Sequence, residues 1–246
     1  MMKTFSAFIA VAIGVALAIG FDAAGAQPAA PKPIPASRFL DPDALRPEQI
    51  LPPPPVDGSP AAREELAELH RIQAARTPEA LARALADDKN EDVTAFAAVM
   101  GPGFQLDRLP ATAALFKDLR AEDSIAAKRA KAYFLRTRPW AADPTIVGCP
   151  HGDDAVKSAY PSGHATMGYA AAAALARLHP ARSQEILARA ADYAENRLVC
   201  GHHYRRDIGA GQTLGTVLLI KLLETPQFRA EFDAAREELR AKGMAD

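Results

Sequence analysis

The chain has 246 residues, of which 49% are hydrophobic and 24% are charged, and its formal net charge is -1. This length suits one domain or at most two, and the high apolar content with little net charge excludes a disordered chain. The near-neutral charge argues against a protein that coats nucleic acid. Two cysteines are too few for a small disulfide scaffold or a four-cysteine zinc site.

The N-terminus has the pattern of a secretory signal peptide. Lys3 supplies a positive charge, Phe5 to Ile19 is an apolar run, and the small residues Ala24 to Ala26 form a cleavage site. The alternative is an uncleaved membrane anchor, but the run is shorter than the ~20 residues that a spanning helix needs. We therefore expect a signal peptide over residues 1–26 and an exported protein, periplasmic or secreted, with no stable membrane insertion after cleavage.

A proline-rich N-terminal extension follows over residues 27–60, with consecutive prolines from Pro52 to Pro55. Such a composition predicts extended polyproline structure, which either lies against a domain or acts as a linker. From Ala61 onward the pattern is helical, so we expect one helical domain over residues 61–246.

The individual helices are predicted from apolar spacing, caps and prolines. Leu66, Leu69 and Ile72 follow the spacing of an amphipathic helix. Thr77 and Pro78 have the pattern of an N-cap followed by proline, which opens a helix that runs to about Asp88. Further helices are expected over residues 91–100, 110–136, 163–178, 183–199, 207–223 and 226–242. Because no segment alternates with a two-residue period, we predict an all-α, single-domain helical bundle.

Cys149 and Cys200 both fall in this predicted domain. In an oxidising compartment they can pair and close a loop of about fifty residues, which is worth roughly 4 kcal/mol on the chain-entropy model. Two separately buried thiols are the alternative, so the disulfide is a hypothesis at this point.

Two clusters of polar residues stand near predicted helix ends. Lys131 and Arg138 are seven residues apart, so on a helix they would return to nearly the same face, although a solvated basic helix end would have the same pattern. Ser162, Gly163 and His164 precede an Ala-rich helical run. A hydroxyl, a backbone amide and an imidazole at a helix N-terminus favour an anion, although an ordinary serine cap is the alternative.

The third cluster contains Arg197, His203 and Asp207. His203 and Asp207 are four residues apart, so one helical turn would let the carboxylate accept a hydrogen bond from the imidazole. A surface His–Asp pair is one alternative. A metal site made of His202, His203 and Asp207 is another, but the positive charges of the neighbouring arginines disfavour the binding of a divalent cation. We expect no metal and no cofactor.

Together, the cations Lys131, Arg138 and Arg197 and a helix N-terminus match the negative oxygens of a phosphate group. The patterns Lys-x6-Arg-Pro, Pro-Ser-Gly-His and Arg-x5-His-x3-Asp resemble, in this order, the signature of the type 2 phosphatidic acid phosphatase superfamily, which includes the vanadium haloperoxidases. Residues 50–242 resemble in particular the secreted class A bacterial acid phosphatases, cysteine positions included. One departure is Asn196, which stands where that family usually has serine.

The resemblance implies a role for each motif residue. His203 would be the nucleophile that forms a phosphohistidine, Asp207 would orient it, and His164 would be the general acid and then the general base. The phosphate would be held by the remaining motif residues, Lys131, Arg138, Ser162, Gly163 and Arg197.

The other histidines fit the family pattern less well. His202 misses the required spacing from Arg197 by one position, and His70 and His179 lie outside the motifs on helical stretches. His151 lies in the loop before the second motif and is kept as a weaker candidate for substrate contact.

The expected function is that of a non-specific acid phosphatase acting on small-molecule phosphate monoesters. We expect an acidic or near-neutral pH optimum, because one imidazole must be neutral and the other protonated. The alternatives are a vanadate-dependent haloperoxidase and a non-catalytic phosphate-binding protein. A membrane lipid phosphatase is disfavoured because the chain lacks multiple spanning segments. No nucleic-acid partner is expected, and a homo-oligomer is left open.

Overall fold

All regular secondary structure in residues 33–41 and 43–244, which are the part of the chain that the computed structural model describes, is helical. The prediction of an all-α fold is confirmed. Contacts group the chain from Ile34 onward into one unit. The predicted signal peptide over residues 1–26 lies outside the described residues. In the described part, no helix combines the length and apolarity needed to cross a membrane.

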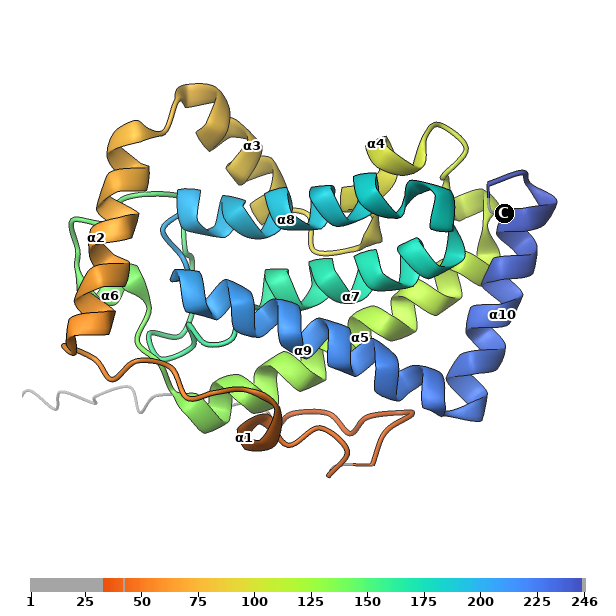
Figure 1. The fold of residues 1–246 in the computed structure, drawn as a ribbon, viewed down its shortest axis with the longest axis horizontal. Helices are drawn as coiled ribbons and strands as arrows, with labels where there is room; N and C mark the ends of the chain where they lie inside the picture. The colour runs from red at the N-terminus through yellow and green to blue at the C-terminus, as the bar shows by residue number, and fades with distance from the viewer. Residues whose placement is uncertain (1–32, 42, 245–246) are drawn as a thin grey trace, which may run out of the picture. The chain divides into compact units, whose positions relative to one another are not determined.

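The long helices follow the predicted ranges closely (Figure 1). They are α2 (Pro60–Ala75), α3 (Pro78–Asp88), α5 (Pro110–Phe134), α7 (Gly163–Leu178), α8 (Ser183–Val199), α9 (Arg205–Glu224) and α10 (Pro226–Ala241). Short helices α1 (Pro47–Ile50), α4 (Ala97–Met100) and α6 (Pro139–Ala142) and the 3-10 turns Val93–Phe96, Leu106–Arg108 and Pro180–Arg182 lie between them. Hydroxyl caps at Ser59, Thr77 and Ser162 begin α2, α3 and α7, because each side chain accepts a backbone amide of the first turn.

Several boundaries differ from the prediction. α5 ends at Phe134 and not at residue 136, because Leu135 adopts a left-handed φ of 50°. α9 begins at Arg205, before the predicted residue 207. The predicted helix over residues 91–100 is a 3-10 turn followed by α4, and α1 and α6 are too short to show a period in the sequence.

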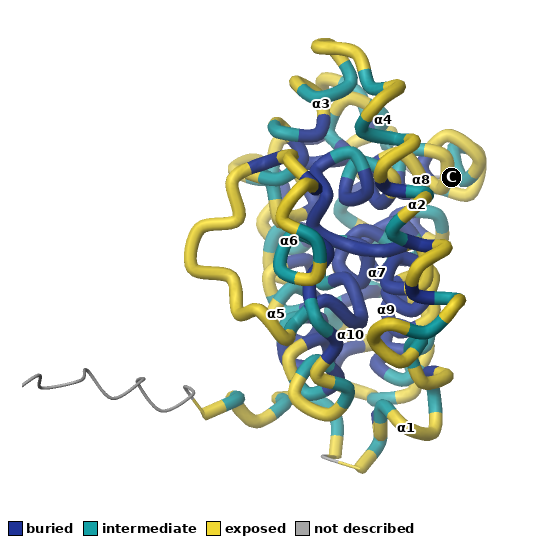
Figure 2. Tube along the Cα trace, turned by 90° about the vertical axis from the view of Figure 1, so that its left-hand side faces the viewer, coloured by how far each residue is buried: buried dark blue, intermediate teal, exposed yellow. Residues whose placement is uncertain are grey.

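Helix α7 lies at the centre of this unit and packs against α5, α8 and α9 (Figure 1). The buried part of the trace follows α7 and α9 in Figure 2. Small residues allow the close approach of these two helices, since a Cβ placed on Gly215 of α9 would lie 2.3 Å from the backbone oxygen of Thr166 on α7. This contact positions the N-terminal end of α7, which begins at the Ser162–Gly163 motif.

The proline-rich segment after residue 33 packs against the helices, which is the first of the two alternatives considered for it. Ser37 donates a hydrogen bond to Glu122 on α5 at 2.6 Å, and the hydroxyl of Tyr160 donates to the carbonyl of Pro52 at 2.6 Å. Leu51 is buried in the main hydrophobic core. The segment therefore supports Tyr160, which directly precedes the second motif.

Candidate active site

A cavity of about 150 Å³ brings residues of all three motifs together. The motif residues on its wall are Lys131, Arg138, Gly163, His164, Arg197 and His203. The wall is completed by Glu91, Arg120, Asp123, Ser124, Ala127, Lys128 and Asp154. Ser162 and Asp207 are not on the wall but are buried next to it, and the Ser162 amide donates to the Asp207 carbonyl at 3.0 Å. The convergence of the motifs, predicted from charge and order alone, is thus present in the fold.

The first motif reaches the cavity by a different route from the one predicted. Lys131 is in the last turn of α5, whereas Arg138 lies beyond the helix in an extended conformation and caps α6. The prediction that the two cations share one helix face is therefore wrong, because the chain leaves the helix at Leu135. The turn at Leu135 still brings both side chains to the same cavity.

Burial and mutual repulsion lower the pKa values of the cations around the cavity. Burial, and then the nearby Arg138, lower the pKa of Lys131 to about 8. Burial also lowers the pKa of Arg138, with Arg197 adding to the effect. Arg138 donates to the carbonyl of His202 at 3.0 Å and lies 3.1 Å from the carboxylate of Asp154. A dianion in the cavity would offset this concentration of positive charge.

The second motif forms the N-terminus of α7. The Ser162 hydroxyl accepts the amide of Ala165 as the N-cap, and Gly163 is the first helical residue. A Cβ on Gly163 would lie 3.7 Å from Nζ of Lys131, so the ammonium group sits beside this helix end. The arrangement places a lysine charge next to the N-terminal amides of α7, which is a favourable environment for an anion.

His164 is held through one nitrogen. Its Nε2 lies 3.2 Å from the carbonyl oxygen of Asp88 and 3.2 Å from Oε1 of Glu91. Both neighbours are acceptors, so Nε2 carries the proton and Nδ1 is the nitrogen that can exchange a proton with a ligand. Burial, and then the charges of Arg197 and Lys131, hold the pKa of His164 well below its usual value.

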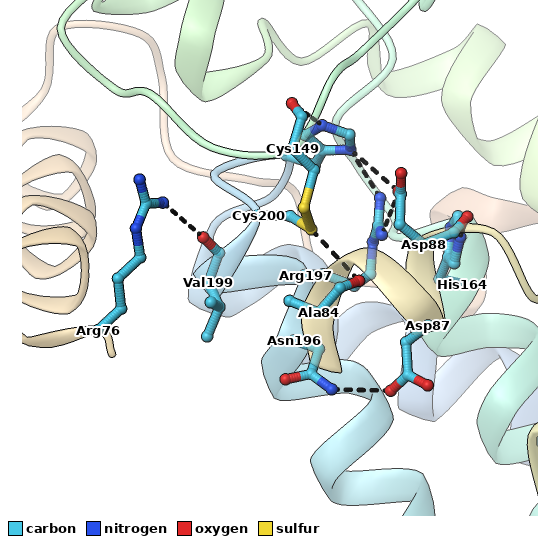
Figure 3. The surroundings of a disulfide bond; sticks show 11 residues. Arg76, Ala84, Asp87, Asp88, Cys149, His164, Asn196, Arg197, Val199 and Cys200 are labelled. Carbon is cyan, nitrogen blue, oxygen red and sulfur yellow. Dashed lines mark hydrogen bonds and ion pairs between the residues drawn. A yellow bond between two sulfur atoms is a disulfide. The ribbon is translucent and has the colours of Figure 1, made fainter. Parts of the chain in front are cut away.

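Arg197, in the last turn of α8, is fixed by two partners. Its Nη1 donates to Asp88 at 2.5 Å, and its Nη2 lies 2.7 Å from Nδ1 of His202. Figure 3 shows Asp88 between Arg197 and His164. The Nε of Arg197 is buried and has no hydrogen-bond partner among the described residues. An unsatisfied buried donor is costly, so a ligand that accepts from Nε would be stabilised here.

His203 has the complementary arrangement to His164. Its Nε2 lies 2.9 Å from Nη1 of Arg138, and a guanidinium can only donate, so Nε2 carries the lone pair. Its Nδ1 donates to the carbonyl of Ala159 at 2.7 Å, whereas Asp207 Oδ2 is 3.5 Å away. The prediction that Asp207 accepts this bond across one helical turn is wrong, because His203 precedes α9 and faces Ala159 instead.

Asp207 belongs to a buried ion network that the sequence analysis missed. Arg136 donates to Asp207 and to Glu65 of α2, at 2.5 Å each, and its guanidinium lies 4.0 Å from the ring centre of Tyr204. The Tyr204 amide also donates to Asp207, at 2.8 Å. Burial raises the pKa of Asp207 to about 7, against the lowering effect of Arg136. The only hint in the sequence was a third cation between Lys131 and Arg138.

A disulfide joins Cys149 and Cys200, which is three residues after Arg197 (Figure 3), so the first of the two alternatives for the cysteines is confirmed. The amide of Cys149 donates to the carbonyl of Cys200 at 3.1 Å. The two segments approach so closely that a Cβ on Gly148 would lie 1.9 Å from that carbonyl oxygen. The disulfide therefore fixes the loop before the second motif against the end of α8.

Three other residues considered in the sequence lie away from the cavity wall. His151 stacks on Trp140 with ring centres 3.9 Å apart and lines a separate hollow with the disulfide. Asn196 donates to Asp87 at 2.7 Å and thereby ties α8 to the end of α3. His70 pairs with Asp143 at 2.9 Å. In the described residues, no group of three His, Cys, Asp or Glu side chains is arranged to hold a metal ion.

Comparisons with known proteins agree with the motifs. The sequence profile of the PAP2 superfamily matches residues 119–230, which contain all three motifs. The non-specific acid phosphatase of Salmonella typhimurium is 29% identical over 206 residues, which cover 81% of this chain and 82% of that protein. The acid phosphatase of Zymomonas mobilis is 34% identical over 197 residues, which cover 77% of this chain and 74% of that protein. The similarity thus extends well beyond the motifs.

Proposed function

The chain belongs to the acid phosphatases of the PAP2 superfamily, and from this premise we propose that it is an exported, metal-independent enzyme that hydrolyses phosphate monoesters through a phosphohistidine on His203. One observation carries the proposal. A single cavity is lined by the three motif cations, a helix N-terminus and two imidazoles whose Nε2 atoms have opposite roles.

The nucleophile is Nε2 of His203, whose lone pair becomes available when Nη1 of Arg138 turns from this nitrogen to a phosphoryl oxygen. This lone pair attacks phosphorus in line, a nitrogen–phosphorus bond forms, and the bond from phosphorus to the leaving oxygen breaks. The proton on Nδ1 stays with the imidazole and is shared with the Ala159 carbonyl, which fixes the ring in the attacking tautomer. Asp207, 3.5 Å from Nδ1, stabilises the positive charge that develops on the ring.

His164 is the general acid and then the general base. In its protonated form it donates from Nδ1 to the leaving alkoxide, and the resulting neutral ring then accepts a proton from the water that hydrolyses the phosphohistidine. The low pKa of His164 in the unliganded protein is caused by burial and by the cations around it. A bound dianion acts in the opposite direction on the ring, so substrate binding favours the protonated form that the first step requires.

The phosphoryl oxygens are held by Lys131, Arg138, the Nε of Arg197 and the Gly163 amide. The Ser162 hydroxyl, buried next to the wall, contributes by capping α7 and so fixing the Gly163 amide at the cavity. These fixed cations and donors neutralise the charge that a divalent ion neutralises in other phosphoryl-transfer enzymes. The enzyme is therefore proposed to need neither a metal nor a cofactor.

The test is release of nitrophenol from its phosphate ester by the parent and by single variants. His203→Ala should lower kcat by about 10³-fold or more, and His164→Ala by about 10²- to 10⁴-fold. His151→Ala is the control, since His151 is outside the cavity. Quenching of the parent with phosphorus-labelled substrate in alkaline detergent, in which the nitrogen–phosphorus bond of a phosphohistidine survives, should trap labelled protein, and His203→Ala should trap none. Labelling of the alanine variant, or loss of activity in EDTA, would contradict the proposal.

Two further measurements address the alternative activity and the export. Vanadate is tetrahedral like phosphate and should inhibit hydrolysis, without giving halide oxidation when peroxide is added. Halide oxidation would instead support the haloperoxidase alternative. N-terminal sequencing of the exported protein should begin at Gln27, the residue after the predicted cleavage site.

A further inference from the structure

His202 contacts both arginines of the cavity although it does not line the cavity itself. Its ring Nδ1 lies 2.7 Å from Nη2 of Arg197, and its backbone carbonyl accepts from Nη1 of Arg138 at 3.0 Å. Its Nε2 lies 3.1 Å from the carbonyl of Cys149, which is in the disulfide. The side chain is 3% exposed, so water does not compete for these contacts.

These neighbours fix one tautomer of the ring. A guanidinium only donates, so Nδ1 must accept from Arg197, and a carbonyl only accepts, so Nε2 must carry the hydrogen. The ring is therefore neutral, and a hydrogen bond at each nitrogen fixes its orientation. Hydrogen-bond partners fix the tautomer and the orientation of histidines in metal sites in the same way.

We propose that His202 is a positioning residue, which holds the guanidinium of Arg197 in the phosphate-binding geometry by anchoring it to the disulfide-bonded segment at Cys149. The inference rests on the proposed function, since it takes Arg197 as a phosphate ligand. Asp88 on Nη1 and His202 on Nη2 together fix the plane of the guanidinium and leave Nε for the ligand. With only one anchor the guanidinium can rotate about that contact.

The charged groups around the ring keep it neutral over most of the pH range. Burial, and then Arg197, lower the pKa of His202 to about 4, with Arg138 acting in the same direction and Asp88, 3.7 Å from Nδ1, opposing them. The imidazoles of His164 and His203 are the other titratable groups in this neighbourhood. A proton on Nδ1 would face the donor Nη2 of Arg197, so phosphate binding through Arg197 should weaken as His202 becomes protonated.

The experiment compares His202→Leu with His202→Asn. Leucine removes the acceptor, whereas the asparagine oxygen can lie near the position of Nδ1 and accept from Arg197 without becoming protonated. Sulfate is the probe because it stays a dianion, and its dissociation constant is measured by calorimetry alongside KM and kcat for nitrophenyl phosphate. We expect His202→Leu to raise the sulfate dissociation constant and KM on the order of tenfold, and His202→Asn to recover most of the affinity.

The matched control is His70→Leu, which changes a half-exposed histidine outside the site and should leave sulfate binding unchanged. Thermal unfolding of each variant separates loss of fold from loss of positioning. Parent-like sulfate binding by His202→Leu, or equally weak binding by the leucine and asparagine variants, would overturn the inference. If His202→Leu does not fold, the comparison of the parent with His202→Asn at several pH values decides. Both proteins contain His164, so the ratio of the parent's sulfate dissociation constant to that of His202→Asn should rise as the pH falls from 6 to 4, and a constant ratio would overturn the inference.

Failure of this inference can be distinguished from failure of the proposed function. An inactive parent that still binds sulfate would argue against the phosphatase mechanism, while the sulfate comparison would still decide the role of His202. An active parent whose His202 variants bind sulfate normally would leave the mechanism standing and remove His202 from it.

Discussion

Two histidines in one cavity receive opposite roles from the atoms that surround them. Nε2 of His203 faces the donor Arg138 and keeps its lone pair, while Nε2 of His164 faces the acceptors Asp88 and Glu91 and keeps its proton. Asp88 and Glu91 lie outside the three motifs, in and just after α3. The motifs alone therefore identify the two rings, and the surrounding fold decides which ring attacks and which transfers protons.

The lowered pKa of His164 gives a prediction about anion binding. In the free protein, burial and the charges of Arg197 and Lys131 hold the pKa of the ring well below its usual value and so favour its neutral form. A bound dianion raises that pKa, so the complex holds more protons than the free protein and binding tightens as the pH falls. Sulfate affinity should rise from pH 7 to pH 5, by at most about tenfold per pH unit.

The measurement is calorimetry of sulfate binding in two buffers that differ in ionisation enthalpy, which gives the proton uptake directly. His164→Asn should remove most of the uptake while the fold stays intact. Proton release, or an unchanged uptake in the asparagine variant, would show that another group titrates.

Asp154 is predicted to compete with the ligand. Its carboxylate lies 3.1 Å from Nη2 of Arg138 on the cavity wall, where a phosphate oxygen would otherwise approach the guanidinium. Replacing it in Asp154→Asn removes a like charge, so the inhibition constant of phosphate should fall about three- to tenfold. Asp153→Asn is the matched control, because Asp153 is exposed and does not line the cavity. Equal changes in both variants would indicate a general charge effect.

At the scale of whole elements, the helices were predictable because each carries a local signal. Ser59, Thr77 and Ser162 cap helices, and prolines occupy the first turns of α2, α3, α5 and α10. The exit from α5 had no such signal, because the left-handed Leu135 is not a glycine or asparagine. The convergence of Lys131 and Arg138 was therefore predicted correctly from an incorrect helix geometry.

The contacts between distant elements were beyond sequence patterns for a different reason. Arg136 joins Asp207 to Glu65 of α2, and each of these acids is 71 residues from Arg136 in the chain. Arg197 likewise reaches Asp88 at the end of α3. Such pairs depend on how helices pack, so a single sequence does not predict which distant charged residues form ion pairs. The structure of the second motif was easier to predict from the sequence, because its hydroxyl cap, glycine and histidine lie within one helix turn.

The packing of α9 against α7 gives a prediction at the same scale. Gly215→Ala would place a Cβ 2.3 Å from the Thr166 carbonyl oxygen, so the helices must separate, and we expect a loss of roughly 1–3 kcal/mol in the free energy of unfolding. Gly209→Ala in the same helix meets nothing within 4 Å and should instead stabilise the protein by about 0.5–1 kcal/mol. Denaturant unfolding of both variants checks this. A destabilised Gly209→Ala or an unaffected Gly215→Ala would contradict the described interface.

For the molecule as a whole, a net charge of -1 conceals an uneven distribution. The wall of one cavity carries five cations, against three acids that partly balance them: Arg120, Lys128, Lys131, Arg138 and Arg197 against Glu91, Asp123 and Asp154. The bulk charge excludes broad classes of partner, whereas the local excess of cations is what selects a dianion. The loop that carries Asp154 is joined to α8 by the disulfide, so the integrity of the cavity and the stability of the fold share one cross-link.

Loss of this cross-link should therefore lower the stability of the whole unit. The bond joins residues 51 apart in sequence, and a loop of that size stabilises the fold by about 4 kcal/mol on the chain-entropy model. Cys149→Ser with Cys200→Ser should lower Tm by roughly 8–16 °C, since 1 kcal/mol corresponds to about 2–4 °C at this chain length. Scanning calorimetry with and without reductant checks the origin of the shift: reductant should lower Tm of the parent toward that of the double variant and leave the variant unchanged. A reductant-insensitive parent whose Tm equals that of the double variant would show that the cross-link contributes nothing to the stability of the fold.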